Sequence, residues 1–95
     1  MKAIRFEWDA GKNKINQKKH GVSFEEARSV FYDDNAFEFY DCEHSAQEER
    51  FLMLGVSSKL RILLVCYAYK EEESVIRIIS ARKATKNEQK VYQEG

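Results

Sequence analysis

Two arginines stand close together near the end of the chain, in a segment that otherwise has the pattern of an apolar strand. Arg77 and Arg82 belong to the stretch VIRIISARKAT, residues 75–85, and Ser80 lies between them. A guanidinium is planar and permanently charged, so it can grip a phosphate with two hydrogen bonds. The two arginines are therefore candidates for phosphate binding. The alternative is that each pairs with an acid, for example Glu88 in the case of Arg82.

The spacing of these arginines raises a question of geometry. Side chains alternate between the two faces of a regular strand, so Arg77 and Arg82 would lie on opposite faces. A bulge near residues 78–80 would bring them onto one face, and bulges often lie beside active sites. Without a bulge, Arg82 would lie past the strand end, at the entrance to the next helix.

Two further residues have side chains suited to the same chemistry. His20 follows a pair of lysines at the end of a predicted helix. Histidine titrates near neutral pH and can transfer protons, although a cation at a helix C-terminus is also favoured by the helix dipole alone. Arg50 opens an apolar strand, where it can bind phosphate or pair with one of the two glutamates before it.

Other kinds of site are not indicated. His20 and His44 are far apart in the sequence, and no Cys or His pair has metal-ligand spacing. The acidic stretch at residues 33–44 lacks the alternating oxygen ligands and central glycine of a calcium loop. No glycine-rich turn precedes a helix, and no serine lies in a nucleophile-elbow sequence. Cys66, within an apolar strand, is expected to be a small core residue. We expect neither a metal nor another cofactor.

Length and composition predict one small globular domain spanning residues 1–95. Hydrophobic residues make up 43% of the chain and charged residues 34%. This balance is typical of folded proteins rather than disordered ones. No apolar run approaches a membrane span, and the N-terminus lacks the apolar core of a signal peptide. The expected compartment is the cytoplasm, with no membrane partner.

The formal net charge of zero conceals an uneven distribution. Residues 1–20 carry six Lys and Arg against two Asp and Glu. Residues 23–49 carry one against nine, and residues 50–95 carry nine against five. If the two basic ends meet in space, they form a basic face that can bind a polyanion, and the acidic segment lies away from it. The alternative is ordinary solvated surface.

Periodicity and capping signals predict an α+β protein. Asp9 can cap a helix that stops at Gly21, whereas Ser23 with Glu26 and Thr85 with Glu88 form potential capping boxes. Val91 and Tyr92 are expected to face inward from the last helix. The predicted strands cover residues 3–8, 36–41, 50–56, 60–69 and 75–82, and the helices cover 10–20, 23–33 and a segment after 85. We therefore expect a mostly antiparallel sheet of about four to five strands, two N-terminal helices and one C-terminal helix.

Three stretches of the chain carry a specific pattern: FEWDAGKNKINQKKHGVSFEEARSVF, EERFLMLGVS and IRIISARKATKNEQKVY. Together they resemble the BrnT family of toxins from bacterial type II toxin–antitoxin modules. The resemblance covers about residues 6–92, and its motifs are specific: FEWD followed by Lys12 and Asn16, the KHGVSF junction, and RIISARKA. One departure is that the stretch FYDDNA lacks the acid–proline pair that members often have, which puts only the shape of a loop in doubt.

The resemblance implies a RelE-like ribonuclease fold and a metal-independent endoribonuclease that blocks translation. It also implies a BrnA-type antitoxin with a ribbon-helix-helix domain, and contact with operator DNA only through the toxin–antitoxin complex. The RNA 2′-hydroxyl would attack the adjacent phosphate. We assign phosphate binding to Arg77, Arg82 and Arg50, and proton transfer to His20. RNA binding is assigned to Lys12, Lys19, Ser80 and Lys83.

A different class of function stays open at this point. The chain could be a nucleic-acid-binding module without catalysis, or an inactive toxin that acts only as a corepressor with its antitoxin. The sequence also leaves a homodimer open. Salt-dependent RNA affinity without cut ends would distinguish the binding module from the ribonuclease.

Overall fold

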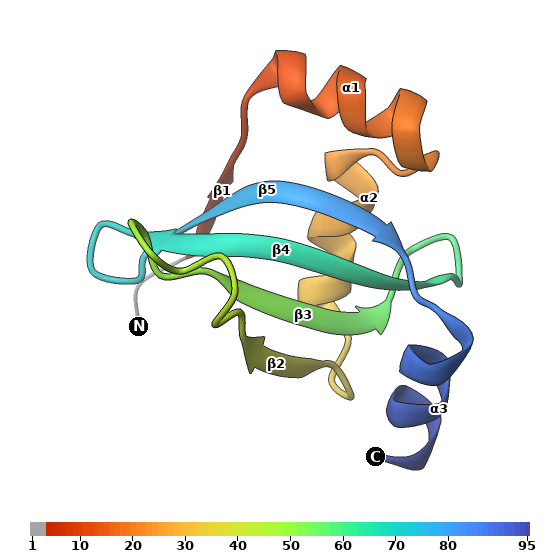
Figure 1. Cartoon of the computed structure of the whole chain (residues 1–95). Coiled ribbons are helices and arrows are strands. Elements are labelled where there is room, and N and C mark those ends of the chain that lie inside the picture. Colours follow the sequence, from red (N-terminus) through yellow and green to blue (C-terminus); the bar gives the residue numbers. More distant parts are fainter. Residues whose placement is uncertain (1–3) are drawn as a thin grey trace.

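The computed structural model describes residues 4–95, which form a five-stranded sheet with helices packed on it (Figure 1). The strands are β1 (Arg5–Glu7), β2 (Phe37–Tyr40), β3 (Phe51–Val56), β4 (Ile62–Lys70) and β5 (Val75–Lys83). The helices are α1 (Ala10–His20), α2 (Phe24–Ser29), the short 3₁₀ turn η1 (Val30–Tyr32) and α3 (Lys86–Glu94). The predicted α+β fold, with its two N-terminal helices and one C-terminal helix, is confirmed.

The sheet is mixed, with strand order β1-β5-β4-β3-β2. Three of its four strand pairs are antiparallel, and β1 pairs in parallel with the first three residues of β5. β1 is shorter than the predicted strand: Ile4 lies outside it and is exposed, and Ala3 lies outside the described residues. Because β1 covers only the beginning of β5, the rest of that strand has a free edge.

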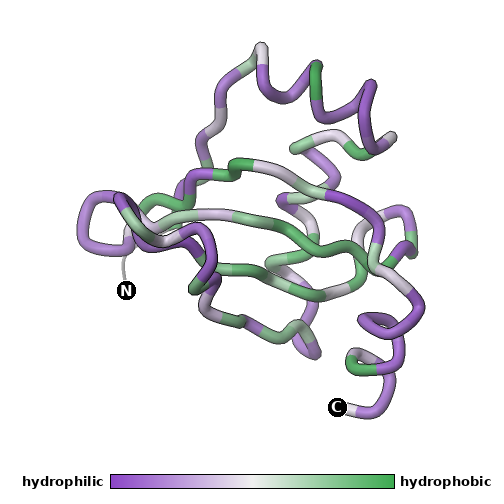
Figure 2. The backbone as a smooth tube through the Cα atoms, viewed as in Figure 1, coloured by the Kyte–Doolittle hydropathy of each residue, from purple (hydrophilic) through white to green (hydrophobic). Residues whose placement is uncertain are grey.

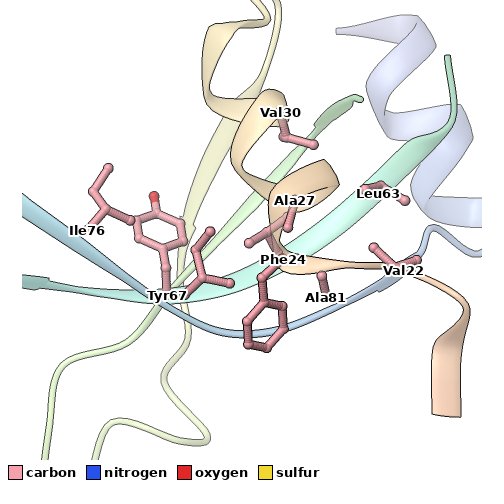
Figure 3. Packing of buried hydrophobic residues seen from close by; sticks show 10 residues of the cluster. Val22, Phe24, Ala27, Val30, Leu63, Tyr67, Ile76 and Ala81 are labelled. Carbon is pink, nitrogen blue, oxygen red and sulfur yellow. The ribbon is translucent and has the colours of Figure 1, made fainter. Parts of the chain in front are cut away.

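The hydrophobic core lies between α2 and one face of the sheet (Figure 3). Phe24, Ala27 and Val30 recur at helical spacing and are fully buried. They pack against alternate residues of the strands, including Leu63, Tyr67, Ile76 and Ala81. Hydrophobic residues are concentrated on the central strands, whereas α1 is mostly hydrophilic (Figure 2). Among residues 4–95, no helix is long and apolar enough to cross a membrane.

Asn16 closes the free edge of β5 and attaches α1 to it. Its side-chain amide donates to the carbonyl oxygens of Ala81 and Val22, each at 2.8 Å, and its carbonyl oxygen accepts from the Ala81 N–H at 3.2 Å. The amide thus takes the place of a neighbouring strand at a buried position, where unpaired backbone groups are costly. This contact positions α1 although its large aliphatic residue, Ile15, is 65% exposed.

The helix-capping predictions are confirmed for two helices and need one correction. Asp9 accepts from the Lys12 N–H, Gly21 ends α1 in the left-handed conformation, and Thr85 with Glu88 forms a capping box. At α2, the Ser23 side chain accepts from the Glu26 N–H, but the Glu26 carboxylate does not complete a capping box.

Glu26 instead forms a buried ion pair with Arg61. Its carboxylate accepts from Arg61 Nε at 3.0 Å and from the Ser57 hydroxyl at 2.6 Å. Burial alone would raise the pKa of Glu26, but these hydrogen bonds outweigh it and hold the pKa below its usual range. The pair ties α2 to the β3–β4 hairpin.

α3 packs beside β3 and is fastened by Tyr92 rather than by Val91. The Tyr92 hydroxyl donates to Asp33 at 2.6 Å, which raises the pKa of Tyr92 to about 12. Val91, predicted to face inward, is 48% exposed. The prediction for Val91 was wrong because α3 follows the sheet end and buries only part of one side.

Candidate functional site

A bulge in β5 places Arg77, Ser80 and Arg82, three of the four candidate residues of that strand, on one face. Ile78 pairs with Tyr67 and Ser80 pairs with Cys66, so Ile79 is an extra residue without a counterpart. Beyond it the alternation is reversed, and Arg82 comes onto the same face as Arg77. The bulge that could unite them is therefore present, and Arg82 lies within the strand rather than past its end. We call this face, which is turned away from α2, the open face.

The open face is hollowed by a cavity of about 460 Å³. Four predicted site residues line it: His20 from α1, Arg50 from the chain just before β3, and Ser80 and Arg82 from β5. A smaller neighbouring cavity of about 190 Å³ is lined by Lys12, Lys19, His20 and Ser80. His20 and Ser80 thus border both cavities, which form one continuous candidate site along the bulged edge of the sheet.

Arg82 is held by Glu88 in the first turn of α3. Its two terminal nitrogens donate to the two carboxylate oxygens at 2.8 and 2.9 Å. These hydrogen bonds lower the pKa of Glu88 and raise that of Arg82. The pairing weighed from the sequence is therefore present, and the Arg82 side chain is still 39% exposed beside the cavity.

Arg77 and Arg50 share a single acid, Glu48. Glu48 bonds most closely to Lys70, whose hydrogen bond is the main cause of its lowered pKa. Arg50 and Arg77 approach it at only 3.8 and 3.9 Å. The Arg50 Nε is buried without a hydrogen-bond partner among the described residues. These two guanidiniums are therefore incompletely paired, unlike Arg82.

One candidate residue lies apart from the others, and one expectation about placement does not hold. Lys83 pairs across the sheet with Leu63, a core residue, so it belongs to the face opposite Arg82 and is not gathered into either cavity. The acidic segment at residues 23–49 does not avoid the basic face, because Asp41 and Glu43 line the main cavity and Glu48 pairs with its cations. Chain connectivity explains this, since the loop from β2 to β3 folds over the open face.

The pair formed by Asp41 and His44 was missed as a catalytic candidate. Asp41 is 8% exposed, and its carboxylate lies 3.1 Å from His44 Nδ1. Both residues line the main cavity with His20 and Arg50. In the sequence, the distance of His44 from His20 bears only on metal binding. The available signal was a carboxylate followed three residues later by a histidine, directly after a strand.

Cys66 lies on the floor of the main cavity. Burial, followed by the charge of Asp41, raises the pKa of its thiol. A protonated thiol is a poor nucleophile. The prediction that Cys66 is a core residue was wrong, because Cys66 pairs with Ser80 on the open face and is only partly buried. Across residues 4–95, no group of three or more His, Cys, Asp and Glu side chains is placed to hold a metal ion.

Fold and site together define a small α+β protein with a cavity lined by arginine, histidine and acidic side chains on an open sheet face. A family model described as the ribonuclease toxin BrnT of type II toxin–antitoxin systems matches residues 8–88. The chain therefore belongs to the BrnT family of ribonuclease toxins. The match extends from Trp8, ahead of α1, through the capping box of α3.

The fold is also similar to a solved structure, the 1.1 Å crystal structure of the Brucella abortus ribonuclease toxin BrnT. The TM-score is 0.67 at 22% sequence identity, with 88% of this chain and 100% of that chain covered. At this identity the similarity supports the fold alone. No curated protein gives a significant sequence match.

Proposed function

We propose that this chain is a metal-independent endoribonuclease that cleaves RNA, inhibits translation and is neutralised by a BrnA-type antitoxin. The observation that carries the proposal is the main cavity, where guanidinium groups from β5 and from the chain just before β3 meet a histidine from α1. RNA cleavage by 2′-hydroxyl attack needs positive charge at the phosphate and groups that take up and supply protons. Preorganised charge of this kind is usually the largest contribution to catalysis.

The phosphate would be bound by Arg50 and Arg82, with Arg77 adding charge from the same face. The Arg50 side chain is 35% exposed and has only a 3.8 Å ion pair with Glu48, so its guanidinium can bind a phosphate oxygen. These guanidiniums supply the charge that a metal ion supplies in other nucleases, which supports a metal-independent reaction. His20 would take the proton from the 2′-hydroxyl.

The RNA on either side of the cleaved linkage would follow the smaller cavity. Lys12 and Lys19 project from one side of α1, four and three residues from Asn16, and both line that cavity with Ser80. Lysines along a groove bind phosphates without regard to sequence, so this contact should weaken as salt is raised. Lys83 lies outside both cavities. It would contact RNA only where the RNA extends beyond them.

The test is cleavage of an unstructured RNA oligonucleotide by the purified protein in EDTA. We expect cut ends that carry a cyclic phosphate and a free 5′-hydroxyl, at a rate that chelation does not change. Complete loss of cleavage in EDTA, restored by one divalent ion, would contradict the metal-independent reaction. An unstructured substrate is needed because RNA folding itself depends on magnesium.

In bacteria, we expect expression of the chain alone to arrest growth and coexpression of its antitoxin to relieve the arrest. Unimpeded growth with soluble protein present would contradict an active toxin. The antitoxin is expected to cover the open face with acidic or apolar segments, since these contacts would both attract it and exclude RNA. A complex that leaves His20, Arg77 and Arg82 open would contradict this mode of neutralisation. The complex, rather than the toxin alone, is proposed to bind operator DNA.

One observation favours the second candidate, a non-catalytic module or inactive corepressor. Arg82 is fully paired with Glu88, so RNA must compete with an internal carboxylate for it. The same cleavage assay separates the two functions. Salt-sensitive RNA binding with intact RNA would support the binding module, whereas defined cut ends support the ribonuclease.

A further inference from the structure

We infer that His44, oriented by Asp41, is a second proton-transfer group of the main cavity and serves as the general acid opposite His20. The inference rests on the proposed ribonuclease function and adds a residue to it. It starts from the juxtaposition of two histidines, from α1 and from the β2–β3 loop, around one cavity that also contains Arg50 and Arg82.

Asp41 is fixed in place by its own backbone. Its N–H donates to the Arg50 carbonyl oxygen at 2.9 Å, and its carbonyl oxygen accepts from the Ser45 hydroxyl at 2.5 Å. Ser45 also accepts from the Arg50 N–H at 3.0 Å. The two ends of the loop are thus clamped together, and the Asp41 carboxylate is held at the cavity wall with little freedom.

The contact between the two side chains fixes the histidine tautomer. His44 Nδ1 lies 3.1 and 3.2 Å from the two Asp41 carboxylate oxygens. An ionised carboxylate can only accept, so Nδ1 must carry the hydrogen. Nε2 then remains without a protein partner in residues 4–95, and the side chain is 62% exposed. An accessible imidazole oriented by a carboxylate through its other nitrogen is the arrangement used for proton transfer in hydrolases.

The charges around His44 come from several elements. Asp41 and Glu43 share its loop and carry negative charge, and Glu48 lines an adjacent hollow with it. Arg50 borders both hollows, while Arg82 and His20 reach the main cavity from β5 and α1. The arginines attract a phosphate to the cavity that His44 lines. This arrangement suits a proton donor beside an anion.

The reaction step balances with these two groups alone. The 2′-oxygen forms a bond to phosphorus while its proton passes to His20. The bond from phosphorus to the 5′-oxygen breaks, and the leaving oxygen receives the proton from His44 Nε2. The products are a 2′,3′-cyclic phosphate and a 5′-hydroxyl, with His20 protonated and His44 neutral. Proton exchange with water restores both residues.

The experiment compares two linkages at the mapped cleavage site of one RNA oligonucleotide, the natural 5′-oxygen linkage and a 5′-sulfur linkage. A thiolate leaves without protonation, so only the natural linkage needs a general acid. His44→Asn keeps a nitrogen donor near the Nδ1 position but lacks Nε2. We expect it to slow cleavage of the natural linkage about 100-fold and of the sulfur linkage less than about 3-fold. It should also remove the decline of the rate at high pH, because that decline reports loss of the acid's proton.

Three further variants complete the design. His20→Asn should slow cleavage of both linkages, since the 2′-hydroxyl needs a base in each reaction. Asp41→Asn alters a positioning residue and should lower kcat for the natural linkage about 10-fold at unchanged KM. The same variant should cleave the sulfur linkage at nearly the wild-type rate. Glu49→Gln removes one charge from the same loop at an exposed position and should cleave both linkages like the wild type. Thermal melting verifies that each variant is folded.

Two results would overturn the inference. One is His44→Asn protein that cleaves the natural linkage at the wild-type rate, and the other is an equal loss for both linkages, which would mean that His44 shapes the site without donating a proton. Wild-type protein that cleaves neither linkage would instead refute the proposed ribonuclease function, and the inference with it.

Discussion

The charged side chains on the two faces of the sheet differ in how completely they are paired. On the helix-covered face, Glu26 is 3% exposed and its carboxylate is fully matched by Arg61 and Ser57. On the open face, one carboxylate, Glu48, is divided among Lys70, Arg50 and Arg77, the two arginines lying at 3.8 and 3.9 Å. A buried charge without full pairing is costly, whereas a partly solvated one can remain available to a ligand. One face is therefore built for stability and the other for binding.

The largest effect is expected on the covered face, from Phe24→Ala. Phe24 is fully buried against the sheet, so truncation should lower the free energy of unfolding by about 3–5 kcal/mol. Phe39→Ala is the matched control, since Phe39 is 40% exposed on the edge strand β2 and should cost less than about 1 kcal/mol. Urea unfolding measures both. Equal losses would mean that the open side contributes as much to stability as the core does.

The next effect separates binding from structure at Arg82. Arg82→Ala should reduce RNA cleavage roughly 100-fold or more, because a preorganised cation at the phosphate is lost. Its stability should fall by no more than about 1 kcal/mol, since the pair with Glu88 is partly exposed. Arg82→Lys should restore cleavage only in part, because an ammonium lacks the two-pronged geometry.

Glu88→Ala is the control for that experiment. It removes the same ion pair and part of the α3 capping box, but it frees the guanidinium for RNA. Cleavage should therefore be retained. A large and similar drop in melting temperature for both variants, with cleavage lost in both, would show that Arg82 is a structural tie between β5 and α3.

Asn16→Ala tests the attachment of α1 to the edge of β5, which borders both faces of the sheet. The substitution leaves three buried backbone groups of Ala81 and Val22 unpaired and should cost about 2–3 kcal/mol. Gln17→Ala, on the same helix, should change stability by less than about 0.5 kcal/mol because Gln17 is exposed. Chemical denaturation compares them. A neutral Asn16→Ala would mean that α1 is held by other contacts.

The smallest expected effects are changes in stability with pH and with salt concentration. Because the folded pKa of Glu26 lies below its usual value of 4.5, its ion pair stabilises the protein above that pH, and this contribution is lost as the pH falls through the lowered pKa. The stability difference between wild type and Glu26→Gln should thus shrink only below about pH 4.5. The same difference for Glu48→Gln should instead vanish at high salt at neutral pH, since its pairs are partly exposed. Salt sensitivity of the Glu26 pair would contradict its burial.

Local features of the chain were predictable because they depend on neighbouring residues. The caps at Asp9, Gly21 and Thr85 each act within one helical turn, and all three are present. The apolar segments at residues 50–56 and 60–69 became β3 and β4 because strand periodicity is read from consecutive residues. The odd spacing of Arg77 and Arg82 indicated where a bulge would matter, and the register of β4 with β5 contains it.

The sequence by itself determined the secondary-structure elements, the α+β class and the cationic residue types, and through its motifs the resemblance to ribonuclease toxins. Only the tertiary structure decided which side chains meet. It directed Glu26 to Arg61 rather than to its own helix cap, turned Lys83 to the face opposite Arg82, and brought His44 and Asp41 to the cavity that His20 lines. The physical reason is that caps and periodicity act over a few residues. Contacts between distant segments depend instead on strand register and on loops folding over a face, which no local pattern encodes.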